Sequence, residues 1–280
     1  MRIVFVVLHY CQIEVTKECV NSLKSLAGVT GVVVVDNASP DKSGTILIEE
    51  YREDPSVHVF LNEKNMGFAC GNNVGYLYAK KELSADCIVV LNNDTIIKDI
   101  AFVEKLNNLK DLNQYHIIGP DILTIKGRHQ NPYREHPLSI NSVKRTLYRK
   151  RLGVLFYSIP IIYRFRRIGK ETNDMIEYTA NLREGIVPHG SAVIYTSIWI
   201  KEQDFAFLPD TFMYYEEDIL YYYSMSKNYK ILFEPTLQII HLEDISTNVA
   251  HAKIRERLLF QSRQKVRSLK VLLRVCSSFD

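Results

Sequence analysis

The chain lacks a long apolar run, which limits how it can meet a membrane. No stretch of its 280 residues approaches the roughly 18 consecutive apolar residues that a membrane-spanning helix needs. The apolar run at residues 3–8 is short, His9 and Tyr10 end it, and no small-residue cleavage site follows. We therefore expect a first strand at this position rather than a signal peptide.

Cysteine is scarce, and its pattern argues against a fold held together by disulfide bonds or by a structural zinc ion. The five cysteines are odd in number, scattered along the chain, and lack the paired spacing of zinc sites. This pattern favours reduced thiols over a disulfide framework or a structural zinc site. The sequence therefore predicts a cytoplasmic protein.

A dinucleotide-binding fingerprint is also missing. Gly67, Gly71 and Gly75 are spaced Gly-x₃-Gly-x₃-Gly rather than Gly-x-Gly-x-x-Gly. No internal repeat or low-complexity linker interrupts the chain, and hydrophobic residues make up 46% of it, as in globular proteins. We expect residues 1–280 to form a single decorated domain with a large core.

The order of the predicted elements indicates an α/β fold. Solid apolar runs at residues 2–8, 31–35, 57–61 and 87–91 alternate with helical patterns at 14–26, 43–52 and 71–83. Such alternation predicts a mostly parallel central sheet with helices on both faces. We interpret residues 1–100 as a nucleotide-binding half.

The second half, residues 101–250, predicts further sheet around an insertion. A helix at 100–112 and a strand at 116–120 precede it. Residues 126–181 read as an inserted basic flap without regular sheet. The later elements are strands at 192–195, 230–233 and 237–241, a helix at 218–226, and a basic amphipathic C-terminal helix within 251–280.

One strand end carries a cluster of oxygen ligands. The apolar run 87–91 stops at Asn92, Asn93 and Asp94. In open α/β sheets, ligands bind at the carboxyl ends of the strands. A carboxylate with neighbouring amide oxygens suits Mn²⁺ or Mg²⁺ carrying a diphosphate. The alternative is an ordinary polar turn, which uses the same residue types.

Two other segments place polar groups at predicted strand or helix ends. Asp36, Asn37 and Ser39 follow the second strand, where a carboxylate accepts hydrogen bonds from a base or a ribose. Asn72 follows Gly71 at a helix start, where amides can meet a ribose or phosphate. A turn at the first segment and tight helix packing at the second are the alternatives.

An acidic triplet and a histidine complete the candidate groups. Glu216, Glu217 and Asp218 repel one another, and in a cleft this repulsion raises a pKa towards the value that suits a general base. The alternative is a helix N-terminus that favours acids. His241 lies at the end of a predicted strand, where its role is that of a metal ligand or of a structural histidine.

Together and in this order, the motifs resemble the inverting family 2 glycosyltransferases of the GT-A fold. The sequence is similar to the subgroup of rhamnosyltransferases and related enzymes of bacterial surface-polysaccharide biosynthesis. The resemblance covers about residues 1–125 and 185–250. It is carried by Val-Asp-Asn-Ala-Ser at 35–39, the Asn- and Gly-rich segment at 65–75, and Leu-Asn-Asn-Asp-Thr at 91–95.

The resemblance implies a role for each matching residue. Asp94 would contact the metal in an Asp-x-Asp-like motif whose first position is Asn92, with His241 as a further ligand. Matching the acidic triplet directly favours Asp218 as the base, whereas aligning its flanks favours Glu217, which we prefer. Gly190 and Ser191 would lie beside the acceptor. The donor would meet Asp36, Asn37, Ser39, Asn65, Gly67, Asn72, Asn92, Asn93 and Asp94.

The implied reaction is metal-dependent hexosyl transfer with inversion. The donor would be dTDP-rhamnose or a UDP-sugar, and the acceptor a hydroxyl of a polyprenyl-diphosphate-linked glycan. A sugar-nucleotidyltransferase is one alternative, although residues 9–12 lack its Gly-rich, basic phosphate loop. A non-catalytic sugar-nucleotide-binding partner of an assembly complex is the other, against which the retained acidic groups and His241 argue.

Basic charge is concentrated in one segment. Nine basic residues and no acidic one lie between Lys144 and Lys170, interleaved with apolar and aromatic residues. This pattern, with the basic C-terminal helix, predicts contact with an anionic membrane at the inner face of the cell membrane. A solvated flap with a homo-oligomer contact is the alternative. No nucleic-acid-binding motif accompanies the charge, so we expect no nucleic acid partner.

Overall fold

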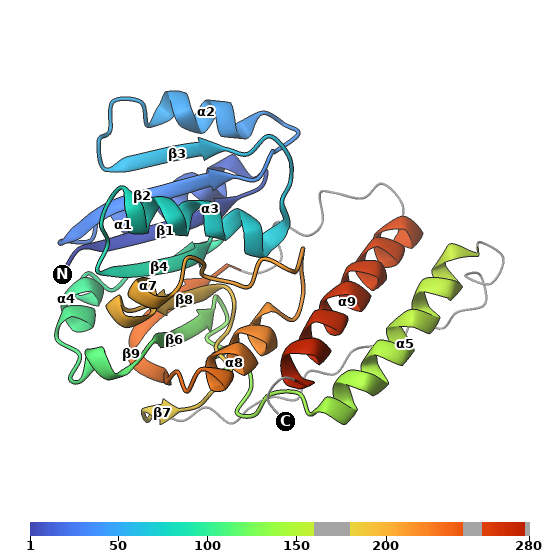
Figure 1. Ribbon diagram of the computed structural model, residues 1–280. Helices are drawn as coiled ribbons and strands as arrows, with labels where there is room; N and C mark the ends of the chain where they lie inside the picture. Colours follow the sequence, from blue (N-terminus) through green and yellow to red (C-terminus); the bar gives the residue numbers. More distant parts are fainter. Residues whose placement is uncertain (160–179, 243–253, 278–280) are drawn as a thin grey trace.

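The fold is built on one mixed sheet. The computed structural model describes residues 1–159, 180–242 and 254–277. Within these ranges nine strands form a sheet of order β3-β2-β1-β4-β8-β6-β9-β5, with β7 paired to β9 (Figure 1). The strands are β1 (Ile3–His9), β2 (Val29–Asp36), β3 (Val57–Leu61), β4 (Cys87–Asn92), β5 (Thr95–Ile96), β6 (Ile117–Thr124), β7 (Arg183–Glu184), β8 (Ala192–Tyr195) and β9 (Ile231–His241).

Strands β1 to β4 pair in parallel, and β8 joins them antiparallel to β4. Helices cover both faces of this sheet, so the predicted α/β class is confirmed. The described helices are α1 (Ile13–Lys24), α2 (Ser43–Glu50), α3 (Gly67–Lys81), α4 (Phe102–Asn107), α5 (Ile140–Ser158), α7 (Ser197–Glu202), α8 (Glu216–Ser226) and α9 (Ile254–Ser277), with a 3₁₀ turn at Leu112–Gln114.

Successive residues of the central strands serve two different cores. Phe5 and Val34 pack with α1, α2 and α4 on one face of the sheet. Val6 and Val35 pack with α3 and α7 on the other. Side chains alternate between the faces of a strand, so burial on both faces requires the continuous apolar runs seen in the sequence.

A third apolar cluster joins α5, α8 and α9. Val143 and Leu147 of α5 pack with Ile219 of α8 and with Leu269 and Leu272 of α9. Figure 1 shows α9 lying between α8 and α5, to one side of the sheet. No helix within the described residues is long and apolar enough to cross a membrane.

Several predicted boundaries differ from the structure. Helix α3 begins at Gly67 rather than Gly71, and α8 begins at Glu216 rather than Asp218. Helix α4 ends at Asn107 instead of reaching residue 112. The two strands predicted at 230–241 are one strand, β9, whose pairing with β6 shifts register next to Pro120.

The inserted segment 126–181 contains more regular structure than its sequence suggests. Helix α5 occupies 19 residues of it, Ile140–Ser158. Apolar residues lie on both its buried and its exposed sides, so no single apolar stripe marks it as an amphipathic helix. Residues 160–179 of the predicted flap lie outside the described part of the chain.

Gly75 allows α3 to lie directly on the sheet. An alanine Cβ there would stand 2.5 Å from Val6 Cγ1 and 2.9 Å from Val35 Cγ2, on stiff β-branched side chains. We expect Gly75→Ala to lower the free energy of unfolding by about 1–3 kcal/mol through overpacking. Gly153→Ala in α5 is the matched control, because its nearest side-chain atoms stand at 3.7 Å. Guanidinium denaturation measures both, and equal stabilities would contradict the packing described.

Candidate active site

Asp94 and His241 meet at the end of the sheet. Strand β5 pairs antiparallel with β9, so that Thr95 faces His241. The Leu242 amide donates to the Asp94 carbonyl over 2.8 Å and fixes this register. His241 Nε2 lies 3.3 Å from Asp94 Oδ1, and the Asp94 carboxylate is buried. The structure thus brings together the two predicted metal ligands.

The chemistry of this pair fits a divalent cation. Asp94 Oδ1 has no hydrogen-bond partner among the described residues, although a buried carboxylate oxygen normally has one. His241 Nδ1 pairs with Gln130 Oε1 at 2.8 Å. An amide oxygen only accepts, so Nδ1 carries the proton and the Nε2 lone pair faces Asp94. An imidazole nitrogen and a carboxylate oxygen together suit Mn²⁺.

The protein supplies only part of a coordination shell here. No cluster of three or more His, Cys, Asp or Glu side chains within the described residues can hold a metal. A cation at Asp94 and His241 would therefore complete its shell with diphosphate oxygens and water, as Mg²⁺ commonly does in phosphate-transfer enzymes.

Asn92 and Asn93 make different contacts from Asp94. The backbone N–H of Asn92 donates to the Ser191 carbonyl over 2.9 Å, which connects the end of β4 to the segment before β8. Asn93 Nδ2 donates to Thr16 Oγ1 over 3.0 Å. The Asn93 side chain therefore binds α1, and its sequence-predicted contact with the donor stays a prediction.

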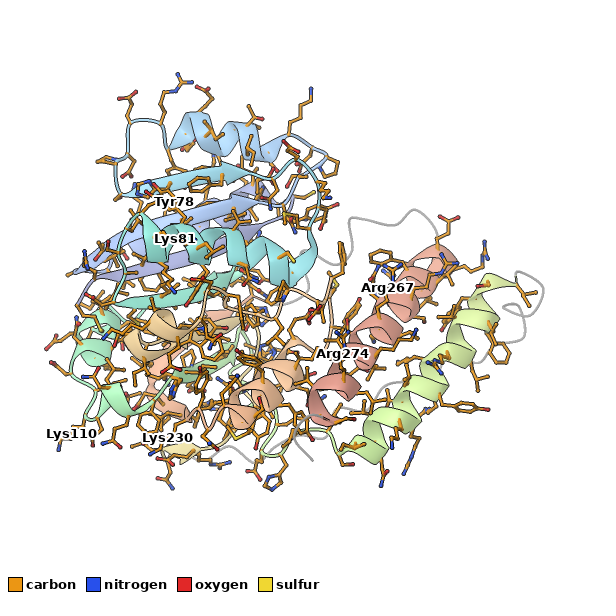
Figure 2. All side chains as sticks on the ribbon, viewed as in Figure 1. Tyr78, Lys81, Lys110, Lys230, Arg267 and Arg274 are labelled. Atoms are coloured by element: carbon orange, nitrogen blue, oxygen red, sulfur yellow. The ribbon has the colours of Figure 1, made fainter. Side chains whose placement is uncertain are left out.

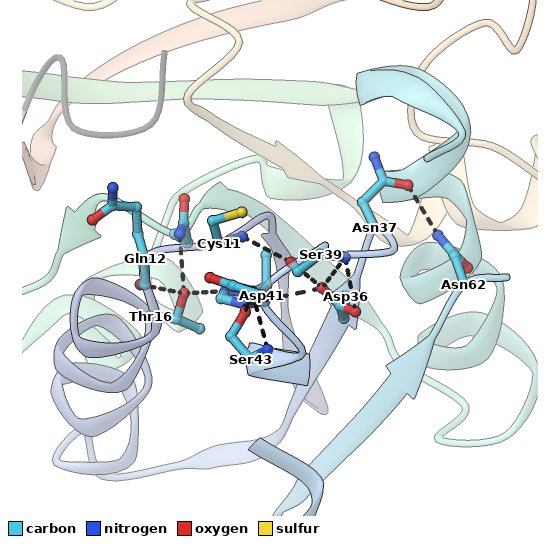
Figure 3. A network of polar contacts seen from close by, with 11 residues as sticks. Cys11, Gln12, Thr16, Asp36, Asn37, Ser39, Asp41, Ser43 and Asn62 are labelled. Carbon is cyan, nitrogen blue, oxygen red and sulfur yellow. Dashed lines mark hydrogen bonds and ion pairs between the residues drawn. The ribbon is translucent and has the colours of Figure 1, made fainter. Parts of the chain in front are cut away.

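Asp36 lies at the end of β2 inside a polar network (Figure 3). Its carboxylate accepts hydrogen bonds from the Ser39 amide at 3.2 Å and from the Ser39 hydroxyl. Ser39 Oγ in turn accepts from the Cys11 amide over 2.8 Å. These bonds hold the turn after β2 against the end of β1. The carboxylate is thereby fixed at the edge of the sheet.

The buried side chain of His9 connects this turn to α1. His9 Nδ1 lies 2.6 Å from Thr16 Oγ1, and Nε2 lies 2.8 Å from Ser43 Oγ. Burial lowers the pKa of His9, against the opposing effect of Asp36, so the imidazole is neutral near pH 7. Because Thr16 also binds Asn93, hydrogen bonds link the Asp36 turn with the turn that carries Asp94.

Asn37 organises the loop that leads into α3. Its Nδ2 donates to Asn65 Oδ1 and to the Gly67 carbonyl, at 3.1 and 3.0 Å. Its Oδ1 accepts from the Met66 amide over 2.9 Å. Gly67 has a φ of +79°, a conformation that favours glycine. Asn37, Asn65 and Gly67 thus shape this loop.

Asn72 has a buried oxygen without a partner. Its Nδ2 donates to the Phe68 carbonyl over 3.0 Å, but Oδ1 makes no hydrogen bond to any described residue. The side chain is fully buried. An unsatisfied buried acceptor is costly, which points to a ligand or water donor at this position.

The acidic triplet begins α8 directly after two residues in the left-handed region. Tyr214 and Tyr215 have φ values of +80° and +67°, which cost energy for residues with large side chains. The three carboxylates then point into different surroundings. Such backbone strain often occurs at functional sites.

Asp218 is fully buried and paired. Its carboxylate forms an ion pair with Arg134 and accepts from the Leu138 amide over 3.1 Å. Burial raises the pKa of Asp218, and Arg134 opposes that shift. The carboxylate therefore holds the chain that leads into α5, which makes it a poor match for a mobile proton acceptor.

Glu217 faces Gly190. An added Cβ at Gly190 would stand 2.8 Å from Glu217 Oε1, so a larger residue there would displace the Glu217 carboxylate from this position. Burial raises the pKa of Glu217, while the Gly190 backbone and Arg134 oppose the shift. A carboxylate with a raised pKa beside an open backbone position has the properties of a general base.

Glu216 is buried beside Glu217. Burial, followed by the charge of Glu217, raises the pKa of Glu216 to about 8. Its Oε1 has no hydrogen-bond partner among the described residues. Glu216 is therefore mainly protonated at neutral pH and adds no negative charge beside Glu217.

The segment 189–191 joins the two parts of the site. Ser191 binds the end of β4, and Gly190 contacts Glu217. The His189 ring lies edge-on to the His241 ring, with centroids 5.9 Å apart. His189 Nδ1 accepts from the Ser191 amide over 3.2 Å, which places the ring proton on Nε2. Burial lowers the pKa of His189 to about 3, so its ring is neutral.

His189, Arg134 and His9 belong to the site, but no sequence motif marks them. A lone histidine usually has a structural role, and Arg134 lies in the segment read as an irregular flap. Arg134 and Asp218 are 84 positions apart, so no local pattern pairs them. The adjacency of His189 to the predicted Gly190 and Ser191 was the one available signal.

The sequence pattern of a known family matches residues 4–173, which is more than half of the chain; the family is described as "Glycosyl transferase family 2". The chain belongs to glycosyl transferase family 2. A relative of this family member is the "Low-salt glycan biosynthesis hexosyltransferase Agl10" of Haloferax volcanii. It is 26% identical over 243 residues, which cover 87% of this chain and 69% of the relative.

Solved structures share the fold at low identity. TarS of S. aureus in complex with UDP-GlcNAc has a TM-score of 0.56 and 17% identity, covering 94% of this chain and 66% of the TarS chain. The mannosyltransferase PcManGT of Pyrobaculum calidifontis, in complex with GDP-Man and Mn²⁺, has a TM-score of 0.55 and 11% identity, covering 99% and 72%. The chain thus spans about two thirds of the TarS chain. This likeness confirms the predicted GT-A-like fold.

The proton on Glu216 generates a pH-dependent stability. Its pKa is about 8 in the folded chain, above the ordinary 4.5, so the folded state holds a proton that the unfolded state releases between these values. The free energy of unfolding of the unmodified protein therefore falls as pH rises through this window. Glu216→Gln removes this titration, and we expect its stability relative to the unmodified protein to increase from pH 5 to pH 8.

Chemical denaturation at three pH values measures this difference, which should reach the order of a few kcal/mol. Glu82→Gln, at an exposed position at the end of α3, is the control and should show no such trend. A pH-independent difference for Glu216→Gln would show that this carboxyl is ionised in the folded protein.

Proposed function

We propose that this family 2 member is a metal-dependent inverting glycosyltransferase that moves a sugar from a nucleoside-diphosphate donor to an acceptor hydroxyl. One observation carries the proposal: segment 189–191 contacts both the Asp94–His241 pair and Glu217. A site for the leaving diphosphate and a site for proton removal therefore lie next to each other, as a single displacement requires.

In this mechanism Glu217 acts as the general base. The acceptor hydroxyl gives its proton to the Glu217 carboxylate while its oxygen forms a bond to the anomeric carbon of the sugar. The bond from that carbon to the diphosphate oxygen breaks on the opposite face, and the nucleoside diphosphate leaves with the electron pair. The configuration at the anomeric carbon is inverted. Glu216, protonated, adds no charge beside the base.

The donor would lie along the carboxyl ends of β1, β2 and β4. Asp94 and His241 would hold Mn²⁺ or Mg²⁺, which neutralises charge on the leaving diphosphate when it is bound. Asp36 retains acceptor capacity for a base N–H, since a carboxylate has about four lone-pair sites. Asn72 Oδ1 offers an acceptor to a hydroxyl or N–H of the donor.

We propose dTDP-rhamnose or a UDP-hexose as donor, and a lipid-linked glycan at the cytoplasmic face of the membrane as acceptor, in the synthesis of surface polysaccharide. The Haloferax relative is a hexosyltransferase of glycan biosynthesis, and TarS was solved with UDP-GlcNAc, both of which support a nucleotide-linked hexose.

Two amide substitutions separate the base from its neighbour. We expect Glu217→Gln to lower nucleoside diphosphate release from a sugar nucleotide with acceptor by about 10²–10⁴-fold, because the proton acceptor is lost. Its stability should change little. Asp218→Asn breaks the pair with Arg134 and should instead lower the free energy of unfolding by a few kcal/mol.

The pH profile provides a further check on this assignment. Burial raises the pKa of Glu217, and the base must be ionised to act. In the unmodified protein, kcat/KM should therefore fall at acid pH with a midpoint above pH 4.5. The residual activity of Glu217→Gln should not show this fall. Full activity of Glu217→Gln would remove this residue from the mechanism.

A further inference from the structure

Helix α5 has an apolar outer face. Its inner side packs through Val143 and Leu147 on α9 and α8. On the opposite side, five large apolar residues are exposed by 37% to 65% of their surface: Tyr148, Leu152, Leu155, Phe156 and Ile159. Tyr148, Leu152 and Leu155 are spaced i, i+4 and i+7, so they form one stripe along the helix, and Ile159 directly follows the last helical residue. Large apolar side chains exposed together on one helix face are typical of an interaction site.

Positive charge flanks this stripe. Helix α5 contains five basic residues and no acidic one. Of these, Lys144, Arg145, Arg149 and Arg151 are exposed. On the neighbouring α9, exposed basic side chains lie four, three and four residues apart, at Arg263, Arg267, Lys270 and Arg274. Figure 2 labels Arg267 and Arg274.

We infer that the outer face of α5 docks onto a membrane containing anionic lipid. A helix with an apolar stripe and basic flanks lies in the lipid interface, with the apolar side chains below the headgroups and the cations among them. A second copy of this chain fits less well. A twofold contact through this face would bring the four exposed basic residues of α5 against the same four, and α5 has no acid to pair them.

The docking helix is bonded to the carboxylate helix α8. The Leu138 amide, two residues before α5, donates to Asp218. Tyr222 of α8 donates to the Leu138 carbonyl over 2.8 Å. From α9, Ser268 Oγ donates to the Met213 carbonyl just before the acidic triplet, also over 2.8 Å. Docking of α5 would therefore fix the orientation of Glu217 relative to the bilayer.

Membrane docking would bring the site to a lipid-linked acceptor, and only this purpose rests on the proposed function. Membrane binding and the nucleotide site can be measured separately. The second readout is the thermal shift produced by UDP with Mn²⁺, which requires no membrane. Each property can then fail without the other.

Vesicle flotation of the full chain tests the surface. We expect the protein to float with phosphatidylcholine vesicles containing phosphatidylglycerol, and to float less as salt increases. Arg145→Glu with Arg149→Glu should weaken partitioning by more than about 30-fold, since loss of each basic residue removes a factor of about five at an anionic surface and each new carboxylate is repelled by it. Leu155→Asp with Phe156→Asp should weaken it by at least as much.

Matched variants carry the same changes elsewhere. Ile100→Asp with Ile125→Asp alters two apolar residues that are 77% and 69% exposed, and Lys81→Glu with Lys110→Glu reverses two exposed charges (Figure 2). These controls should float like the unmodified protein. No flotation of the unmodified protein, or equal loss in α5 and control variants, would overturn the inference. Self-association that only the α5 variants abolish would assign the face to a second copy.

Discussion

The burial of negative charge is the constraint on which the site depends. Asp94, Glu216, Glu217 and Asp218 all lie in poorly solvated surroundings, where an uncompensated carboxylate is costly. Each meets this cost differently. Asp218 pairs with Arg134, Glu216 keeps its proton, Glu217 faces the Gly190 backbone, and Asp94 lies beside His241 with one oxygen unsatisfied. Only the last two retain capacity for a substrate or a cation.

The remaining architecture places these two groups. Strands β5 and β9 bring His241 to Asp94, and the pairing of β4 with β8 brings segment 189–191 beside them. Buried hydrogen bonds through Thr16 and His9 connect the Asp94 turn with the Asp36 turn. These bonds hold Asp36 and Asp94, which we propose to bind opposite ends of the donor, in fixed positions relative to each other. Such preorganisation lowers the entropic cost of positioning the donor.

The sequence predicts local features well and distant pairings poorly. The strands that end at Asp36 and Asn92 are predictable because both faces of each are buried, which produces continuous apolar runs. The sequence pattern does not predict helix α5, because its apolar residues lie on two opposite sides of the helix. The Arg134–Asp218 pair and the position of His189 depend on tertiary contacts that no local spacing reveals. The motifs identify the candidate carboxylates, but only their surroundings distinguish Glu217 from Asp218.

The most direct test of the proposed site is metal-dependent nucleotide binding, measured by thermal shift with UDP, dTDP, GDP and CMP, each with Mn²⁺, Mg²⁺ or EDTA. A ligand at ~100 times its dissociation constant adds about 2.7 kcal/mol of stability, which is readily detected. The predicted result is a shift with a pyrimidine nucleoside diphosphate that requires the cation and that Asp94→Ala abolishes. Asp99→Ala, which removes a partly buried carboxylate on the far side of β5, should preserve the shift. No shift with any nucleotide, or an unchanged metal-dependent shift in Asp94→Ala, would contradict it.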